Sequence, residues 1–295
     1  MRVNKSLIPW SIPSSATRSV LLGPVAAAAL ALTVVAADAA PAKPTLVVCS
    51  PGSPGTTDEA QPRMDALAAA ISGKAGTQIG AVYDPTDAGG VSRLKTAELG
   101  MVSLPFFLQH EQELGLHARL QPVAKDHPAL EKWALVVQKG KVKGPEGLAG
   151  FTIMSNVAFS PAFVRGVVLG GFGALPATTK LTQSTAVLSS LRHAADGDPV
   201  AVLLDSAGEA SLASLPFGSK LEVIAHSPPV PAGVIVSIDA RMPAKTWTGI
   251  EKAILGLGGD QASAGTLDAL LLTKFMPLDD KALAAARKSF AEAAK

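Results

Sequence analysis

The side chains that most often bind metals or carry out catalysis are scattered along this chain. Its 295 residues hold five histidines and one cysteine, Cys49. No two histidines stand in the H-x-x-x-H or H-E-x-x-H arrangement of a zinc site on a helix. His110 and His117 could share one face of a helix, but no carboxylate is placed to complete a site. The sequence therefore predicts no metal site and no catalytic residues, and a single cysteine excludes an internal disulfide framework.

The motifs of common enzyme classes are missing as well. The chain has no G-x-S-x-G motif and no Walker sequence. Segments 171–173 and 256–258 begin like the dinucleotide-binding motif G-x-G-x-x-G, but Pro176 and Gln261 stand at the last glycine position. We therefore expect a binding protein without a cofactor. An exported hydrolase is the alternative, and it would need a histidine beside an aspartate such as Asp205 or Asp84.

Composition limits the class of protein further. Hydrophobic residues make up 48% of the chain and charged residues only 17%, which excludes a disordered chain and a solvated coiled coil. The formal net charge is +2, and segment 1–39 accounts for it with Arg2, Lys5, Arg18 and Asp38. The remaining chain is formally neutral, so we expect no nucleic-acid partner.

Residues 1–39 predict a secretory signal peptide. A cationic start precedes an apolar stretch over residues 20–37, and Ala37-Asp38-Ala39 has the small-x-small pattern that signal peptidase accepts. We predict cleavage after Ala39 and a location in the periplasm. The alternative is an uncleaved membrane anchor, because the apolar stretch is close to the ~20 residues that a membrane span requires. Gly23-Pro24 interrupts the stretch, which favours cleavage.

The mature chain alternates between strand and helix patterns. Apolar runs at 45–49, 78–83 and 101–104 predict buried strands, and the segments 58–72 and 91–99 between them have helical spacing. This alternation predicts a parallel sheet with helical crossovers.

The rest of the chain continues the α/β pattern and ends in helices. Helices are predicted over 161–170 and 181–193, and every segment after residue 244 is predicted to be helical. The final helix, 281–294, follows Asp279 and Asp280, either of which can cap it. Further strands are predicted at 133–138, 151–154, 200–204, 221–225 and 233–238.

Five segments carry a resemblance to a known family: 99–107 (LGMVSLPFF), 133–139 (WALVVQK), 143–154, 191–205 and 223–231. In order and spacing they resemble the periplasmic solute-binding proteins of ABC importers, in particular the phosphate/phosphonate-binding branch. The resemblance implies an α/β fold of two lobes, each a mostly parallel sheet flanked by helices, joined by two hinge strands. It assigns residues 40–135 and 235–295 to lobe I and residues 136–234 to lobe II.

The resemblance also implies a small-molecule ligand in the cleft between the lobes, where loops follow the strand ends. It implies a permease of an ABC transporter in the inner membrane as partner, and we expect a monomer. The candidate ligand-binding residues are Ser50, Ser53, Tyr83, Asp84, Leu104, Pro105, Phe106, Ser155, Asn156, Phe159, Ser160, Phe163 and Asp205.

The sequence departs from the oxyanion-binding pattern of this branch. Segment 155–161 carries apolar residues where the branch has a loop rich in serine and threonine, and Ser103 or a neighbour replaces the lobe I aspartate. Phe106, Phe159 and Phe163 are expected near the cleft. An anion needs several hydrogen-bond donors, whereas an apolar ligand needs shape and apolar area. We predict a neutral or largely hydrophobic ligand, with a phosphate- or phosphonate-type oxyanion as the alternative.

Most of these candidates also fit an ordinary structural role. The phenylalanines can be core residues, and Tyr83 can pack at a strand end. Asp84 can cap the turn at Pro85, and Asp205 can cap the turn toward Gly208. A further alternative for the whole chain is a sensor or scaffold whose cleft is filled by its own side chains.

Overall fold

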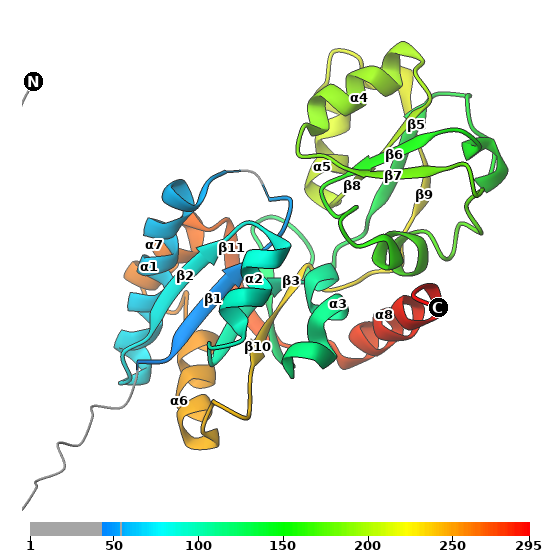
Figure 1. The fold of residues 1–295 in the computed structure, drawn as a ribbon. Helices are drawn as coiled ribbons and strands as arrows, with labels where there is room; N and C mark the ends of the chain where they lie inside the picture. Colours follow the sequence, from blue (N-terminus) through cyan, green and yellow to red (C-terminus); the bar gives the residue numbers. More distant parts are fainter. Residues whose placement is uncertain (1–42, 54) are drawn as a thin grey trace, which may run out of the picture. The chain divides into compact units, whose positions relative to one another are not determined.

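The computed structural model describes residues 43–53 and 55–295. The chain divides into two units, Met1–Pro41 and Ala42–Lys295. The predicted signal peptide and its cleavage after Ala39 lie outside the described residues. Within those residues, no helix is long and apolar enough to cross a membrane. The second unit contains two β-sheets with helices packed on them (Figure 1).

The first sheet has six strands: β1 (Thr45–Cys49), β2 (Gly80–Asp84), β3 (Leu99–Ser103), β4 (His117–Ala124), β10 (Gly233–Ser237) and β11 (Leu272–Pro277). Their order across the sheet is β11-β4-β10-β3-β1-β2. β1 pairs in parallel with β2 and β3, whereas β10 and β11 pair antiparallel with their neighbours. The carboxyl ends of β1, β2 and β3 therefore meet at one edge, where loops can form a ligand crevice.

Helices cover both faces of this sheet: α1 (Thr57–Ala75), α2 (Asp87–Leu94), α3 (Leu104–Leu114), α6 (Ala244–Leu255), α7 (Gln261–Ala269) and α8 (Asp280–Ala293). One core cluster joins α1 and α6 to the sheet and includes Leu67, Ile71 and Ile250. A second cluster includes Leu94 of α2 and Phe106 of α3. Each such side chain contributes about 1.5–3 kcal/mol when it is fully buried.

Local sequence signals determine where α1 begins and ends. The Thr56 hydroxyl accepts a hydrogen bond from the Glu59 N–H, and the Glu59 carboxylate accepts one from the Thr56 N–H at 2.8 Å, which forms a capping box. Gly76 ends the helix in the left-handed conformation with φ of 67°. The fixed start of α1 holds Arg63 and Met64 in its first half.

The second sheet has five strands: β5 (Ala134–Gln138), β6 (Thr152–Ser155), β7 (Lys180–Gln183), β8 (Val200–Leu204) and β9 (Leu221–His226). Their order is β7-β6-β8-β5-β9, with β6 parallel to β7 and β8 and with β5 antiparallel to β8 and β9. The helices of this part are short: η1 (Pro145–Leu148), the π-helix η2 (Phe163–Val168), α4 (Val187–Asp196), α5 (Ser206–Ser211), η3 (Leu212–Ser214) and η4 (Gly218–Lys220). Two helix-flanked sheets confirm the predicted α/β fold class, with antiparallel pairs in both sheets.

Two neighbouring segments, 125–133 and 227–232, connect the sheets. Glu131 and Val230 pair as an antiparallel bridge, and the N–H of each donates to the carbonyl oxygen of the other at 2.8 and 2.9 Å. The Ser227 hydroxyl accepts a hydrogen bond from the Trp133 N–H at 2.9 Å. This pair of segments stands where the resemblance puts two hinge strands. The exact lobe boundaries at 135 and 234 stay a prediction.

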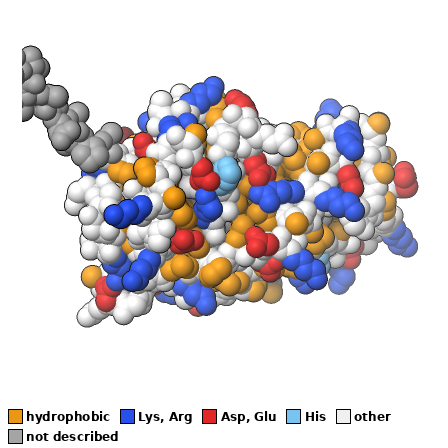
Figure 2. Space-filling model, turned by 90° about the horizontal axis from the view of Figure 1, so that it is seen from below, with side chains coloured by type: hydrophobic (Ala, Val, Ile, Leu, Met, Phe, Trp, Pro, Cys, Tyr) orange, Lys and Arg blue, Asp and Glu red, His pale blue; other side chains and the backbone are white. Residues whose placement is uncertain are grey.

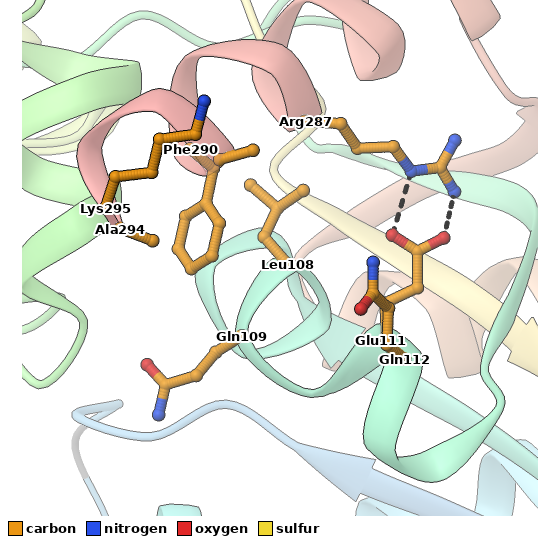
Figure 3. A pocket seen from close by; sticks show the side chains of 9 residues that line it. Leu108, Gln109, Glu111, Gln112, Arg287, Phe290, Ala294 and Lys295 are labelled. Atoms are coloured by element: carbon orange, nitrogen blue, oxygen red, sulfur yellow. Dashed lines mark hydrogen bonds and ion pairs between the residues drawn. The ribbon is translucent and has the colours of Figure 1, made fainter.

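Helix α8 contacts elements of both sheets. Arg287 donates two hydrogen bonds to the Glu111 carboxylate of α3, at 2.9 and 2.5 Å, and Figure 3 shows this pair at the side of a pocket between the two helices. Further along α8, Gly166 of η2 lies so close that a Cβ there would be 2.3 Å from the carbonyl oxygen of Ser289. α8 therefore forms a third connection between the sheets.

Several predicted elements differ from the structure. The helix predicted over 181–193 begins only at Val187, because residues 180–183 form β7 beside β6. The C-terminal region is not wholly helical, since β11 adds an edge strand to the first sheet. The helix predicted over 91–99 is α2, which starts at Asp87 and ends at Leu94, and β4 was not predicted. The final helix is capped by Asp279, which accepts the Ala282 N–H at 2.9 Å.

Candidate ligand-binding site

A pocket of about 410 Å³ opens at the edge of the first sheet where β1, β2 and β3 end. This volume falls in the range of about 300–1,000 Å³ that is typical of small-molecule sites. Loop residues after β1, the first half of α1 and the segment between α7 and β11 form the walls. The lining residues are Val48, Cys49, Ser50, Ser53, Ala60, Arg63, Met64, Tyr83, Met101, Val102, Ser103, Pro122, Ala232, Gly233, Ala269, Leu270, Leu271 and Leu272.

Apolar side chains dominate the walls of this pocket. Met64 comes from α1 and Met101 from β3, while Leu270, Leu271 and Leu272 approach from the end of α7. Leu271 is 70% exposed and has a positive φ of 55°, a conformation that is uncommon for leucine. The pocket therefore presents adaptable methionine and leucine surface to a ligand.

Three of the predicted ligand-binding residues line this pocket: Ser50, Ser53 and Tyr83. The Ser53 hydroxyl donates to the Ser50 hydroxyl at 2.8 Å. The Tyr83 side chain is buried, which raises the pKa of its phenol, and charge on Cys49 and Asp84 acts in the same direction.

The loop after β1 touches the loop after β6 of the second sheet. Gly52 has φ of 82°, and a Cβ at this position would lie 2.2 Å from the carbonyl oxygen of Asn156. Only glycine permits this approach. The structure thus brings Asn156, a predicted ligand-binding residue, next to the loop that carries Ser50 and Ser53.

Solved structures similar to this chain include a binding component of an ABC transporter. The binding component of a phosphonate ABC transporter from Pseudomonas aeruginosa matches with a TM-score of 0.63 at 16% identity, covering 85% of this chain and 87% of that chain. XAC2383 from Xanthomonas citri, bound to chloride ion, matches with a TM-score of 0.68 at 15% identity, covering 85% and 98% of the two chains. PhnD1 from Prochlorococcus marinus, in complex with methylphosphonate, matches with a TM-score of 0.59 at 15% identity, covering 84% and 97%.

The chain has the two-lobed fold of the periplasmic solute-binding proteins. No protein-family model and no curated protein sequence matches it. At 15–16% identity the likeness concerns the fold, and the ligand has to be argued from the side chains of the site.

The predicted apolar residues lie in the core rather than in the pocket. Phe106 and Phe163 are 0% exposed, and Leu104 is 1% exposed. Phe163 packs edge-on against Trp133 with ring centroids 6.1 Å apart. Pro105 is buried in the first turn of α3, and Phe159 is partly buried against the same core. The apolar surface of the pocket comes from residues other than these predicted ones. A ligand contact by Leu104, Pro105, Phe106, Phe159 or Phe163 stays a prediction.

Both predicted aspartates hold local structure in this two-lobed fold. Asp84 accepts hydrogen bonds from the Thr86 hydroxyl at 2.7 Å and from the Arg93 Nε at 2.9 Å. Burial alone would raise the pKa of Asp84, but these hydrogen bonds outweigh burial and lower it. Asp205 caps α5 by accepting the Gly208 N–H at 2.7 Å. These are the capping roles that the sequence left open for both residues.

The two predicted serines Ser155, at the end of β6, and Ser160, before η2, differ in how they are bonded. The Ser155 hydroxyl donates to the Leu203 carbonyl oxygen at 3.2 Å and accepts the Val157 N–H at 3.3 Å. Ser160 is 1% exposed, and its hydroxyl has no hydrogen-bond partner among the described residues. Among the predicted ligand-binding residues near the second sheet, Ser160 is therefore the one whose hydroxyl has a hydrogen bond left to donate.

Four of the five histidines, His110, His117, His193 and His226, pair with carboxylates outside the pocket. His110 lies 2.9 Å from Asp87, and His226 lies 2.7 Å from Glu209. No group of three metal-ligating side chains occurs among residues 43–53 and 55–295. Among these residues no histidine bonds to Asp205 or Asp84, the aspartates that the hydrolase alternative names.

A carboxyl group at the hinge was not predicted from the sequence. Burial raises the pKa of Glu131 to about 8, the charge of Asp205 adds to this, and the Trp133 indole acts against it. The Trp133 Nε1 has no well-formed hydrogen bond within the described chain, so this indole only partly compensates the carboxyl group. The only sequence signal was an acid placed directly before a buried strand.

The pocket also contains residues that sequence reasoning missed. The sequence pattern predicted Arg63 and Met64 as ordinary positions of an amphipathic helix. It predicted Leu270–Leu272 as part of a helical C-terminal region. They reach the pocket because the first half of α1 and the start of β11 both lie at the carboxyl ends of β1 and β3.

Proposed function

We propose that this protein is an exported solute-binding receptor that captures a small molecule between its lobes and delivers it to a membrane transporter. The observation that carries the proposal is the pocket of about 410 Å³ at the carboxyl edge of the first sheet. It faces a loop of the second sheet through the Gly52–Asn156 contact, in a fold shared with solute-binding proteins.

Binding would act through closure of the lobes about the hinge. A ligand that contacts both sides favours the closed arrangement by the difference between its affinities for the two arrangements. The Glu131–Val230 bridge keeps the two hinge segments together, so rotation of the lobes leaves their connection intact. No chemical step is part of this function.

We propose a ligand with a large apolar surface, because apolar side chains, two methionines and three leucines among them, form most of the pocket wall. A phosphate- or phosphonate-type oxyanion is the second candidate. Two proteins of similar structure come from phosphonate transport or hold methylphosphonate, and the unused hydroxyl of Ser160 is a donor in the second sheet.

The remaining parts of the proposal concern location and partners. Segment 1–39 would direct the chain to the periplasm, and the partner would be the permease of an ABC transporter. The receptor would act as a monomer without a cofactor. On the face shown in Figure 2, acidic and basic side chains lie interspersed among apolar ones, as on a soluble receptor that binds no polyanion.

The test measures the distance between the lobes as a function of ligand. Leu188 of α4 and Leu255 of α6 are 52% and 40% exposed, so cysteines at these positions can carry a donor and an acceptor dye in a Cys49→Ala background. We expect a saturable change in energy transfer with phenylphosphonate or methylphosphonate.

The two ligand candidates give different orders of affinity in this assay. A largely apolar ligand site predicts a response to phenylphosphonate at lower concentration, and an oxyanion site predicts equal responses or a preference for methylphosphonate. A screen of small molecules in which no compound changes the energy transfer would overturn the receptor function. Doubly labelled protein unfolded in urea provides the control for direct effects on the dyes.

A further inference from the structure

The pocket holds polar side chains that donate hydrogen bonds and find no acceptor in the described part of the chain. The Ser103 hydroxyl is buried and unpartnered. Arg63 forms no ion pair within 4.0 Å among the described residues, and the Tyr83 hydroxyl bonds to none of them. A buried donor without an acceptor costs about 1–3 kcal/mol, so the Ser103 hydroxyl favours a ligand that accepts hydrogen bonds. Arg63 is exposed, so its guanidinium is free to bind an anionic group without first losing another partner among the described residues.

The charged side chains that line the pocket carry only positive charge. Arg63 is the single charged side chain among the lining residues, and no aspartate or glutamate is among them. The carboxylates nearby are already used: Asp84 binds Thr86 and Arg93, and Glu59 belongs to the capping box of α1. A ligand that contacts the pocket therefore meets one positive charge with no competing acid.

The rest of the pocket needs apolar surface on the ligand. A phosphate-sized anion displaces only a few water molecules, each about 30 Å³ in liquid volume, which leaves most of the cavity solvated. Met64, Met101 and Leu270 would then stay in contact with water. An apolar group that covers them gains about 25 cal/mol for each Å² removed from water.

We propose, on the basis of the receptor function above, that the ligand is an organic anion with one anionic head and an apolar body. Arg63 recognises the charge of the head, and the hydroxyl groups of Tyr83 and Ser103 donate to its oxygens. The apolar body lies against Met64, Met101 and Leu270. Carboxylates, phosphonates and sulfonates that carry a ring or an alkyl chain belong to this class.

Isothermal titration calorimetry with matched compounds tests both halves of the proposal. Phenylphosphonate should bind at least about ten-fold more tightly than methylphosphonate, and phenylacetate at least about ten-fold more tightly than neutral phenylacetamide. Arg63→Gln should abolish the preference for phenylacetate and leave the affinity for phenylacetamide unchanged. Arg192→Gln, which removes an arginine from α4 outside the pocket, is the matched control and should change neither ratio.

The anionic head and the apolar body of the proposed ligand are tested independently of each other. Equal binding of phenylphosphonate and methylphosphonate overturns the apolar body, and equal binding of phenylacetate and phenylacetamide overturns the anionic head. An unchanged preference in Arg63→Gln overturns the role of Arg63. If none of the four compounds binds but another molecule changes the distance between the lobes, the ligand class is wrong and the receptor function stands.

Discussion

Glu131 is the residue whose ionisation the fold penalises most clearly, because it is partly buried at the hinge beside Asp205. Its pKa is raised from 4.5 to about 8 in the folded protein. The unfolded chain therefore releases this proton at lower pH than the folded chain does. The contribution of Glu131 to stability is greatest below pH 4.5, and it is lost as the pH rises toward about 8.

Glu131→Gln should remove this loss, because glutamine cannot ionise. We expect the variant to be more stable than the wild type by about 2 kcal/mol at pH 8.5 and to differ little at pH 4.5. Urea denaturation between pH 4.5 and pH 9 measures the difference. Glu146→Gln, at an exposed position, is the control, and an identical pH slope in wild type and Glu131→Gln would contradict the account.

Cys49 gives a second residue-scale prediction. Its thiol is 0% exposed, and burial together with Asp84 and Asp87 raises its pKa to about 12. Because the thiolate is the reactive form, iodoacetamide at pH 8 should alkylate the native protein many times more slowly than the urea-unfolded protein. Mass spectrometry of the intact chain measures both rates, since this is the chain's single cysteine. Comparable rates in the two states would show that the thiol is accessible.

At the scale of elements, the contact between α8 and the π-helix η2 depends on a missing side chain. A Cβ at Gly166 would lie 2.3 Å from the Ser289 carbonyl oxygen and 2.7 Å from the Ala293 Cβ. Gly166→Val should push α8 away from η2 and lower the melting temperature by roughly 5 °C, equivalent to about 2 kcal/mol. At Gly171 a Cβ meets nothing within 4 Å, so Gly171→Val is the control. Equal melting temperatures for both variants would exclude the close contact.

The sequence predicted elements well where apolar runs are continuous and buried. Residues 45–49 and 200–204 are strands in the interiors of their sheets, and both were predicted from such runs. β4 and β11 were not predicted from the sequence because polar residues and prolines interrupt their apolar patterns. β7 was not predicted because it is an edge strand that pairs on one side only. The periodicity of hydrophobic residues reflects burial. Strands whose burial depends on residues distant in the sequence therefore have a weak hydrophobic pattern.

The candidate site was predictable only in part, for a related reason. Ser50, Ser53 and Tyr83 follow strand ends and lie in the pocket, as the rule for parallel sheets predicts. Arg63 and Leu270 lie there because α1 and the segment after α7 converge on one sheet edge. No spacing in the sequence indicates that convergence. Phe106 and Phe163 are expected binding residues that the structure places in the core.

At the scale of the whole molecule, the described chain offers three connections between its two sheets. Two are the paired hinge segments, and the third is α8, which binds α3 through Glu111 and Arg287 and lies against η2. Closure of the lobes must preserve the hinge pair and shift the α8–η2 contact. The proposed function thus predicts that the position of α8 depends on whether a ligand is bound.

The measurement that tests the central claim most directly is small-angle X-ray scattering of residues 40–295, the chain left by the predicted cleavage after Ala39, with and without phenylphosphonate at saturation. The account predicts a smaller radius of gyration with the ligand, and the same change should be absent in Arg63→Gln at that concentration. Calorimetrically confirmed binding with no change in the radius of gyration would contradict a receptor that closes on its ligand.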